Sequence, residues 1–254
     1  MYMSKFSLGT VAGIEKRKSA NSGAPSVVAQ PAARLTETQA LTLAQNIGGL
    51  GHSNLTLAML CRINATAALT EIGGVNQIIG CRHGGNGRLI QIQTDNTFGD
   101  YKLTIGDSQT GTAGGAFATQ PPINEWIFLA LSSPAASGTL LAAWQRLSGD
   151  TTQRTITRAN GVEASVQAQN IFVNGEGTTG VLTSIDVQYI RGYDSYSDAA
   201  SLAAQALSTN AAGALFWWGV DSGGVWTDKS GNNRTPTVVG TPAIRSDGPV
   251  IAAM

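Results

Sequence analysis

The chain has 254 residues, of which 42% are hydrophobic and 13% are charged, and its 16 basic and 16 acidic residues cancel. A chain of this length can bury a full core without disulfides or metals, and all-β domains of this size are often single. The balanced charge excludes a global field that attracts nucleic acid, and no apolar stretch approaches the roughly 20 residues that a membrane-spanning helix needs.

Residues 1–35 are predicted to form an N-terminal arm, followed by one domain over residues 36–254. The arm holds five basic residues against Glu15 alone, and Pro25 and Pro31 interrupt a stretch rich in Ser, Ala and Gly. Such a segment is expected to be flexible or anchored on a partner. Its anchoring residues would be Lys5, Phe6, Lys16, Arg17 and Lys18.

From about Leu41 onward the sequence alternates between apolar and polar residues. In residues 55–63 the apolar side chains recur with period two, which predicts a strand with one face on a core. Further short segments follow, separated by turns rich in Gly and Asn, and this spacing favours an antiparallel sandwich. These segments are residues 77–82, 88–93, 101–105, 125–132, 140–147, 165–173, 183–191 and 215–220.

One short helix is predicted over residues 198–207, where Ala and Leu recur at helical spacing after Ser197, a suitable cap. The glycine-rich stretches at 84–85 and 111–115 are expected to be loops, because neither joins a strand to a helix. Cys61 and Cys81 both fall in predicted strands. They are either two buried thiols or a bridge between neighbouring strands, which would need an oxidising compartment.

Five segments carry a resemblance by their order along the chain: residues 55–63, 124–130, 171–175, 185–193 with the helix that follows, and 225–233. In this order they resemble the concanavalin A-like lectin and glucanase superfamily, which includes laminin G-like domains. The resemblance implies an all-β, two-sheet jelly-roll, and it implies glycan binding, protein binding, glycan hydrolysis or a structural role. Trp126 is expected to fill the core between the sheets. Asn174 and Gly175 are expected to supply the positive φ angles of a tight hairpin.

An enzyme is not expected. Glucanases of this fold resemble one another in a Glu-x-Asp-x-x-Glu strand motif, and none of the six glutamates here has an Asp two residues later. His52 and His83 lack the Gly-x-Ser-x-Gly context of a nucleophile elbow, and they and the two cysteines miss the paired spacing of a zinc site.

Aromatic residues near the C-terminus are the candidates for a sugar-binding surface. They are Trp217, Trp218, Trp226, Tyr193 and Tyr196. Trp217 and Trp218 are adjacent on a strand and face opposite ways, so at least one of them is expected to enter the core. No cofactor is expected. If a metal binds, calcium is favoured, at Asp221, Asp228 and Asn232, although ordinary turn chemistry is the preferred explanation of these residues.

The first hypothesis is therefore a non-enzymatic structural or decoration protein of a bacteriophage particle. The arm would anchor it to other virion proteins, and an oligomeric sandwich would face outward from the virion surface. The first ten residues do not resemble a signal peptide, so an extracellular protein of this kind would be released by another route, such as lysis. The alternative is a glycan-binding adhesion or receptor-binding module, and a glycanase is disfavoured.

Overall fold

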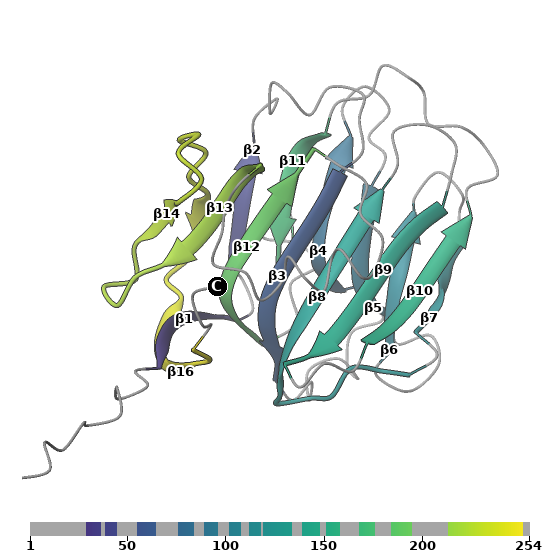
Figure 1. Cartoon of the computed structure of the whole chain (residues 1–254), viewed down its shortest axis with the longest axis horizontal. Helices are drawn as coiled ribbons and strands as arrows, with labels where there is room; N and C mark the ends of the chain where they lie inside the picture. The colour runs from purple at the N-terminus through teal and green to yellow at the C-terminus, as the bar shows by residue number, and fades with distance from the viewer. Residues whose placement is uncertain are drawn as a thin grey trace, which may run out of the picture.

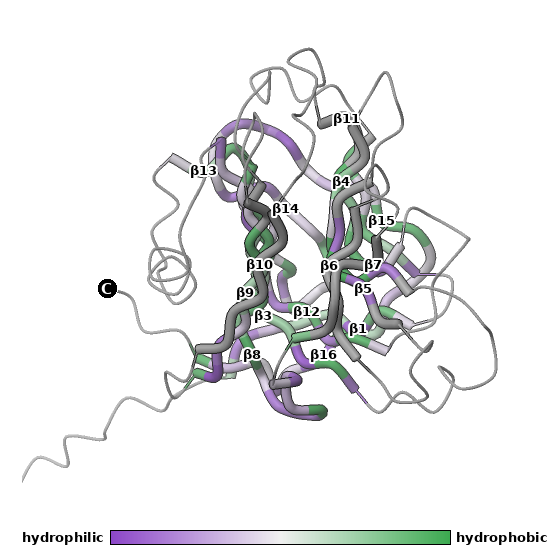
Figure 2. Tube along the Cα trace, turned by 90° about the vertical axis from the view of Figure 1, so that its right-hand side faces the viewer, coloured by the Kyte–Doolittle hydropathy of each residue, from purple (hydrophilic) through white to green (hydrophobic). Residues whose placement is uncertain are grey.

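The computed structural model is a sandwich of two β-sheets that lie face to face in two layers (Figure 1 and Figure 2). It describes residues 29–36, 39–44, 55–64, 76–83, 89–95, 102–107, 112–117, 119–133, 139–147, 151–157, 168–175, 184–194 and 213–250. Within these ranges every strand pairing is antiparallel and no helix occurs, so none of them contributes a helix able to cross a membrane. The predicted all-β, two-sheet jelly-roll class is confirmed. The predicted helix over 198–207 lies outside the described residues.

The first layer is a nine-stranded sheet. Its strands are β1 (Gln30–Leu35), β3 (Leu55–Ile63), β8 (Trp126–Ser133), β9 (Thr139–Arg146), β10 (Thr151–Thr157), β12 (Ile185–Tyr193), β13 (Ala214–Val220), β14 (Trp226–Asp228) and β16 (Ala243–Gly248). They follow the order β10-β9-β8-β3-β12-β1-β16, and β13 joins the sheet by pairing with β12 and carries β14 on its other edge.

The second layer is a seven-stranded sheet. Its strands are β2 (Ala40–Ala44), β4 (Asn76–His83), β5 (Leu89–Asp95), β6 (Lys102–Asp107), β7 (Thr112–Ala116), β11 (Ala168–Val173) and β15 (Thr237–Val239). They follow the order β15-β2-β11-β4-β5-β6-β7. Every segment predicted as a strand overlaps an observed strand.

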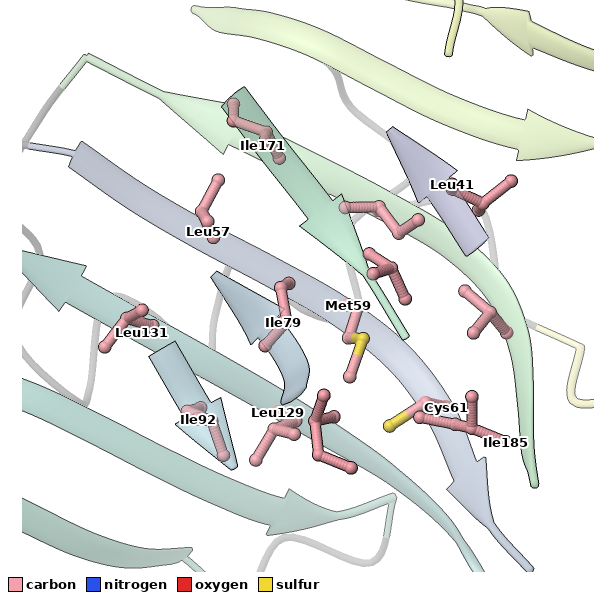
Figure 3. Close-up of a cluster of buried hydrophobic side chains, with 14 of the residues drawn as sticks. Leu41, Leu57, Met59, Cys61, Ile79, Ile92, Leu129, Leu131, Ile171 and Ile185 are labelled. Carbon is pink, nitrogen blue, oxygen red and sulfur yellow. The ribbon is translucent and has the colours of Figure 1, made fainter. Parts of the chain in front are cut away.

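The hydrophobic core fills the space between the two layers. Leu57, Met59 and Cys61 of β3 point toward Ile79 of β4 and Ile92 of β5 (Figure 3). These three side chains lie on the face that the period-two pattern of residues 55–63 predicts. The second cysteine, on β4, is also buried in this core, and both cysteines are free, which confirms the interpretation as two thiols.

Two predictions about irregular segments are wrong. The stretch at 111–115 was expected to be a loop, but Thr112–Ala116 forms β7 because its backbone pairs with β6 along the end of the seven-stranded sheet. The boundary of the arm at residue 35 is also wrong, because β1 lies between β12 and β16 and buries Ala32, Ala33 and Leu35. Residues 1–28, with the predicted anchoring residues, lie outside the described residues.

Asn174 and Gly175 end β11 with the positive φ angles that the sequence predicts, 62° and 100°. The tight hairpin expected there is wrong, because β11 and β12 belong to different sheets. The buried Asn174 instead ties the turn between β1 and β2 to the end of β11. Its Nδ2 donates to the carbonyl oxygens of Thr36 at 3.2 Å and Gln39 at 2.9 Å.

A row of side chains crosses four neighbouring strands on the face of the nine-stranded sheet that points away from the core. Trp126, Arg62, Asp186 and Arg34 are successive cross-strand partners on β8, β3, β12 and β1. The Arg62 guanidinium lies 5.1 Å from the centre of the Trp126 indole. Trp126 is thus half-buried on the outer face and does not fill the core as predicted, because Ile127 occupies the core-facing position beside it.

Asp186 is the centre of this row. Its side chain has no exposed surface, and both of its oxygens accept hydrogen bonds from Arg34, at 2.6 and 2.9 Å. Arg62 donates to the same carboxylate through Nε at 2.8 Å. Burial alone would raise the pKa of Asp186, but the hydrogen bonds from the two arginines outweigh burial and hold this pKa below its usual range.

Stability is expected to decrease in acid for this reason. A carboxylate with a lowered pKa in the folded state stabilises the fold above its unfolded pKa, and this contribution is lost as the pH falls through the folded value. The free energy of unfolding, measured by urea denaturation at several pH values, should therefore fall steadily below about pH 4. An Asp186→Asn variant should show a shallower dependence, and equal slopes for the two proteins would contradict the assignment.

Candidate functional site

The candidate site lies where the nine-stranded sheet divides. β3 follows one edge of β12 along its whole length, whereas the other edge is shared between two strands. β1 pairs with residues 185–187 of β12, and β13 pairs with residues 189–193 (Figure 1). The pairing of β12 with β3 shifts register between Val187 and Tyr189, so Gln188 is an extra residue at a bulge. The two edge strands therefore diverge at Gln188.

A pocket of about 630 Å³ opens at this division, and it is called the fork pocket here. It is lined by residues 29–31 at the start of β1, by Gln188 and Tyr189 at the bulge, by Trp217 and residues 219–222 of β13 and its turn, and by Lys229. This volume falls within the range of about 300–1,000 Å³ that is usual for small-molecule sites.

Trp217 forms an aromatic wall of the fork pocket. The side chain is half-buried, and the Arg191 guanidinium lies 4.3 Å from the centre of its ring. Arg191 is the cross-strand partner of Trp217, is almost wholly buried, and also stacks at 4.5 Å on the ring of Tyr189. A cation held between two aromatic rings is attracted to both of them. This stack holds the indole in a fixed orientation beside the pocket.

Two buried polar atoms of the pocket lining have no hydrogen-bond partner. They are Gln188 Oε1 and Tyr189 Oη. The amide of Gln188 is held in place because its Nε2 donates to the carbonyl oxygen of Pro249 at 2.9 Å. Burial raises the pKa of Tyr189, so its hydroxyl stays protonated near neutral pH and can donate. Buried polar atoms are normally paired, so this acceptor and this donor are unusual features of the two residues.

The rim of the pocket carries two opposite charges. Lys229 is exposed and crosses over Gly219: a Cβ on that glycine would lie 2.9 Å from Lys229 Nζ. Glycine at this position therefore leaves room for the lysine to lie against the strand. Asp221 is also exposed, and its Oδ1 accepts from the backbone amides of Gly223 at 2.8 Å and Val225 at 2.9 Å.

The aromatic residues that the sequence suggests as one sugar-binding surface do not lie in one place in the structure. Trp217 lines the fork pocket, whereas Trp218 points into the core and stacks on Phe216 with ring centres 4.4 Å apart. Trp226 and Tyr193 are buried too, and neither lines the pocket. Tyr196 lies outside the described residues.

The three residues proposed for calcium shape the C-terminal turns. Asp228 accepts hydrogen bonds from the backbone amides of Trp217, Ser230 and Arg234 at 2.7–3.0 Å. Burial alone would raise the pKa of Asp228, but these amides lower it below the usual range. Asn232 donates its Nδ2 to two carbonyl oxygens at the start of β13, and Asp221 is engaged as described above. In the described part of the chain no three His, Cys, Asp or Glu side chains gather around a metal position, and calcium stays a prediction.

Sequence patterns do not point to Gln188, Tyr189 or Lys229. Gln188 and Tyr189 both line the pocket because a bulge interrupts the period-two pattern of β12. No residue type near Gln188 predicts this bulge. Lys229 lies in the turn that holds the calcium candidates, but a lysine is not a calcium ligand. The register of β12 against two different edge strands is what brings these residues together.

No protein-family profile matches the sequence, and no curated protein sequence matches it. Solved structures share the fold. A "putative carbohydrate binding protein" from Bacteroides ovatus matches with a TM-score of 0.55 at 16% identity, over 89% of this chain and 62% of that one. The chain therefore spans less than two thirds of the length of that protein.

Two further structures match less well. The cellulose induced protein Cip1 has a TM-score of 0.37 at 10% identity, over 56% of this chain and 68% of its own. A native heptameric SAP-like pentraxin from Limulus polyphemus has a TM-score of 0.42 at 8% identity, over 85% of this chain and 97% of its own. The likeness to the Bacteroides ovatus protein shows the two-sheet sandwich fold. These likenesses give no support to a role in a virus particle.

Proposed function

We propose that this protein is a glycan-binding module whose ligand site is the fork pocket. The observation that carries the proposal is the Trp217 ring in one pocket with the polar residues Gln188, Asp221 and Lys229. A sugar has an apolar C–H face, which packs on an aromatic ring, and hydroxyl groups, which need donors and acceptors beside it. The Bacteroides ovatus protein of the same fold is named for carbohydrate binding, which supports this function over the virion role.

Binding without hydrolysis is part of the proposal. Retaining glycosidases place two carboxyl groups about 5 Å apart, and inverting enzymes place them about 6.5–9.5 Å apart. Among the described residues that line the fork pocket, Asp221 carries the single carboxylate. Its Oδ1 is already engaged by two backbone amides. The pocket lining therefore favours recognition of a sugar over cleavage of its glycosidic bond.

The test is the Trp217→Ala variant, examined on a glycan array and then by calorimetry with the glycans that the wild-type protein binds. Loss of a buried aromatic contact at the centre of a site costs about 2 kcal/mol or more, which is about thirty-fold in affinity. The matched control is Trp126→Ala, which removes another half-buried indole from the outer face of the same sheet but outside the pocket.

The control variant should bind as the wild-type protein does. Glycan binding that survives in a folded Trp217→Ala variant would refute the site. A wild-type protein that binds no glycan on a broad array would refute the function.

A further inference from the structure

We infer that the fork pocket selects acidic sugars, and that Lys229 binds the carboxylate of a uronic acid or a similar carboxylated unit. This inference rests on the proposed function and adds the chemical class of the ligand. A neutral sugar needs only the aromatic ring and polar atoms of the pocket. The charges around that ring are what point to an anionic ligand.

Lys229 supplies the first of these charges. It lines the pocket and is exposed, and within the described residues no hydrogen bond or ion pair engages its ammonium group. Its backbone amide donates to the carbonyl oxygen of Trp217 at 2.7 Å, so the lysine is held beside the aromatic ring. An ammonium group with three available donors, fixed beside a sugar platform, is suited to a carboxylate.

Arg191 supplies the second positive charge, beneath the platform. Its guanidinium lies 4.3 Å from the centre of the Trp217 ring. An aromatic ring has a negative face that repels an anion, and a cation against one face offsets that repulsion on the other. A carboxylated sugar can therefore pack on this indole at a smaller electrostatic cost than on an isolated one.

Among the described residues of the lining, Asp221 carries the negative charge that opposes this ligand. Two backbone amides point at its Oδ1, and these dipoles offset part of its negative charge. Lys229 and Arg191 carry two positive charges near the pocket against this one.

The experiment compares acidic oligosaccharides with their methyl esters, which keep the sugar skeleton and remove the charge. The probes are oligogalacturonate, oligoglucuronate and alginate oligosaccharides, each with its ester, titrated into the full-length protein by calorimetry. The wild-type protein should bind at least one acid about ten-fold more tightly than its ester, and salt should weaken only the binding of the acid.

Three variants separate the roles of the charges. Lys229→Met keeps the aliphatic stem over Gly219 and should remove the preference for the acid, whereas Lys229→Arg should keep most of it. Asp221→Asn retains an oxygen for the two backbone amides and should tighten binding of the acid about two-fold, because a repelling charge is lost. Lys229→Met and Asp221→Asn should change binding of the esters by less than they change binding of the acid.

The outcomes distinguish the two proposals. Equal affinity for acids and esters, both lost in Trp217→Ala and unchanged in Lys229→Met, would overturn the acidic preference and leave glycan binding in place. Binding of neutral glycans alone would do the same. Failure of the wild-type protein to bind any acidic or neutral glycan would overturn both.

Discussion

Replacement of Asp186 with alanine is expected to lower the free energy of unfolding by about 3–5 kcal/mol, nearer to the lower figure. The carboxylate is fully buried, and it joins Arg34 of β1 to Arg62 of β3 through the central strand β12. Without it, Arg34 loses this counter-charge, and Arg62 is left with the exposed carboxylate of Asp247. The arginine side chains keep 30% and 15% of their surface exposed, so water offsets part of the loss.

Urea denaturation at neutral pH measures this loss directly. The matched control is Asp247→Ala, which removes the other carboxylate bound to Arg62, at 2.9 Å. Asp247 has 44% of its side chain exposed, and an exposed pair that is screened by solvent contributes less than about 1 kcal/mol. If the two variants lost the same stability, burial of Asp186 would not be the reason for its importance.

The core could be predicted from the sequence because it depends on local periodicity. Alternate residues of a strand point to opposite faces, so Leu57, Met59 and Cys61 identify the buried face of β3 without knowledge of any neighbour. Asn174 and Gly175 could be predicted for a similar reason, since few residue types tolerate a positive φ angle. The strands that this turn connects could not be predicted, because the sequence does not show which sheet the next strand joins.

Long-range pairing explains the misplaced arm. Residues 30–35 contain a proline and two alanines and resemble a linker, yet Arg34 binds Asp186, which lies 152 residues away in sequence. The place of β1 in the sheet depends on this distant partner, and its short local sequence does not reveal it. Trp126 was misplaced for a related reason: its size suggested the core, but the alternation of β8 assigns the core face to Ile127 and Leu129.

The aromatic part of the candidate site could be predicted from the sequence, but the polar part could not. Adjacent Trp217 and Trp218 must face opposite ways on a strand, so an outward indole was expected there, and the structure identifies Trp217 as that residue. The polar half of the pocket depends on a bulge and on the division of one strand edge between β1 and β13. Both are properties of the register between strands, which a single sequence does not display.

The same pair of tryptophans gives the second large expected effect. Trp218→Ala is expected to lower the free energy of unfolding by about 3–5 kcal/mol, because truncation of a fully buried Trp leaves a cavity. The Trp218 ring has no exposed surface, stacks on Phe216, and donates its Nε1 to the carbonyl oxygen of Arg234 at 2.5 Å. The variant therefore loses apolar packing and also leaves that oxygen without this donor.

Trp217→Ala is the matched comparison, since it removes the same side chain from the neighbouring position of β13. Its half-buried indole packs on Arg191 and not in the core, so we expect the free energy of unfolding to fall by about 1 kcal/mol.

Urea denaturation of both variants, together with glycan titration, should show that Trp218→Ala mainly loses stability and that Trp217→Ala mainly loses binding. Similar destabilisation of both would place Trp217 among the residues that hold the fold, and a fall in glycan binding could then not be assigned to the pocket. Separation of the two effects would show that one strand supports the core with one face and presents the ligand platform with the other.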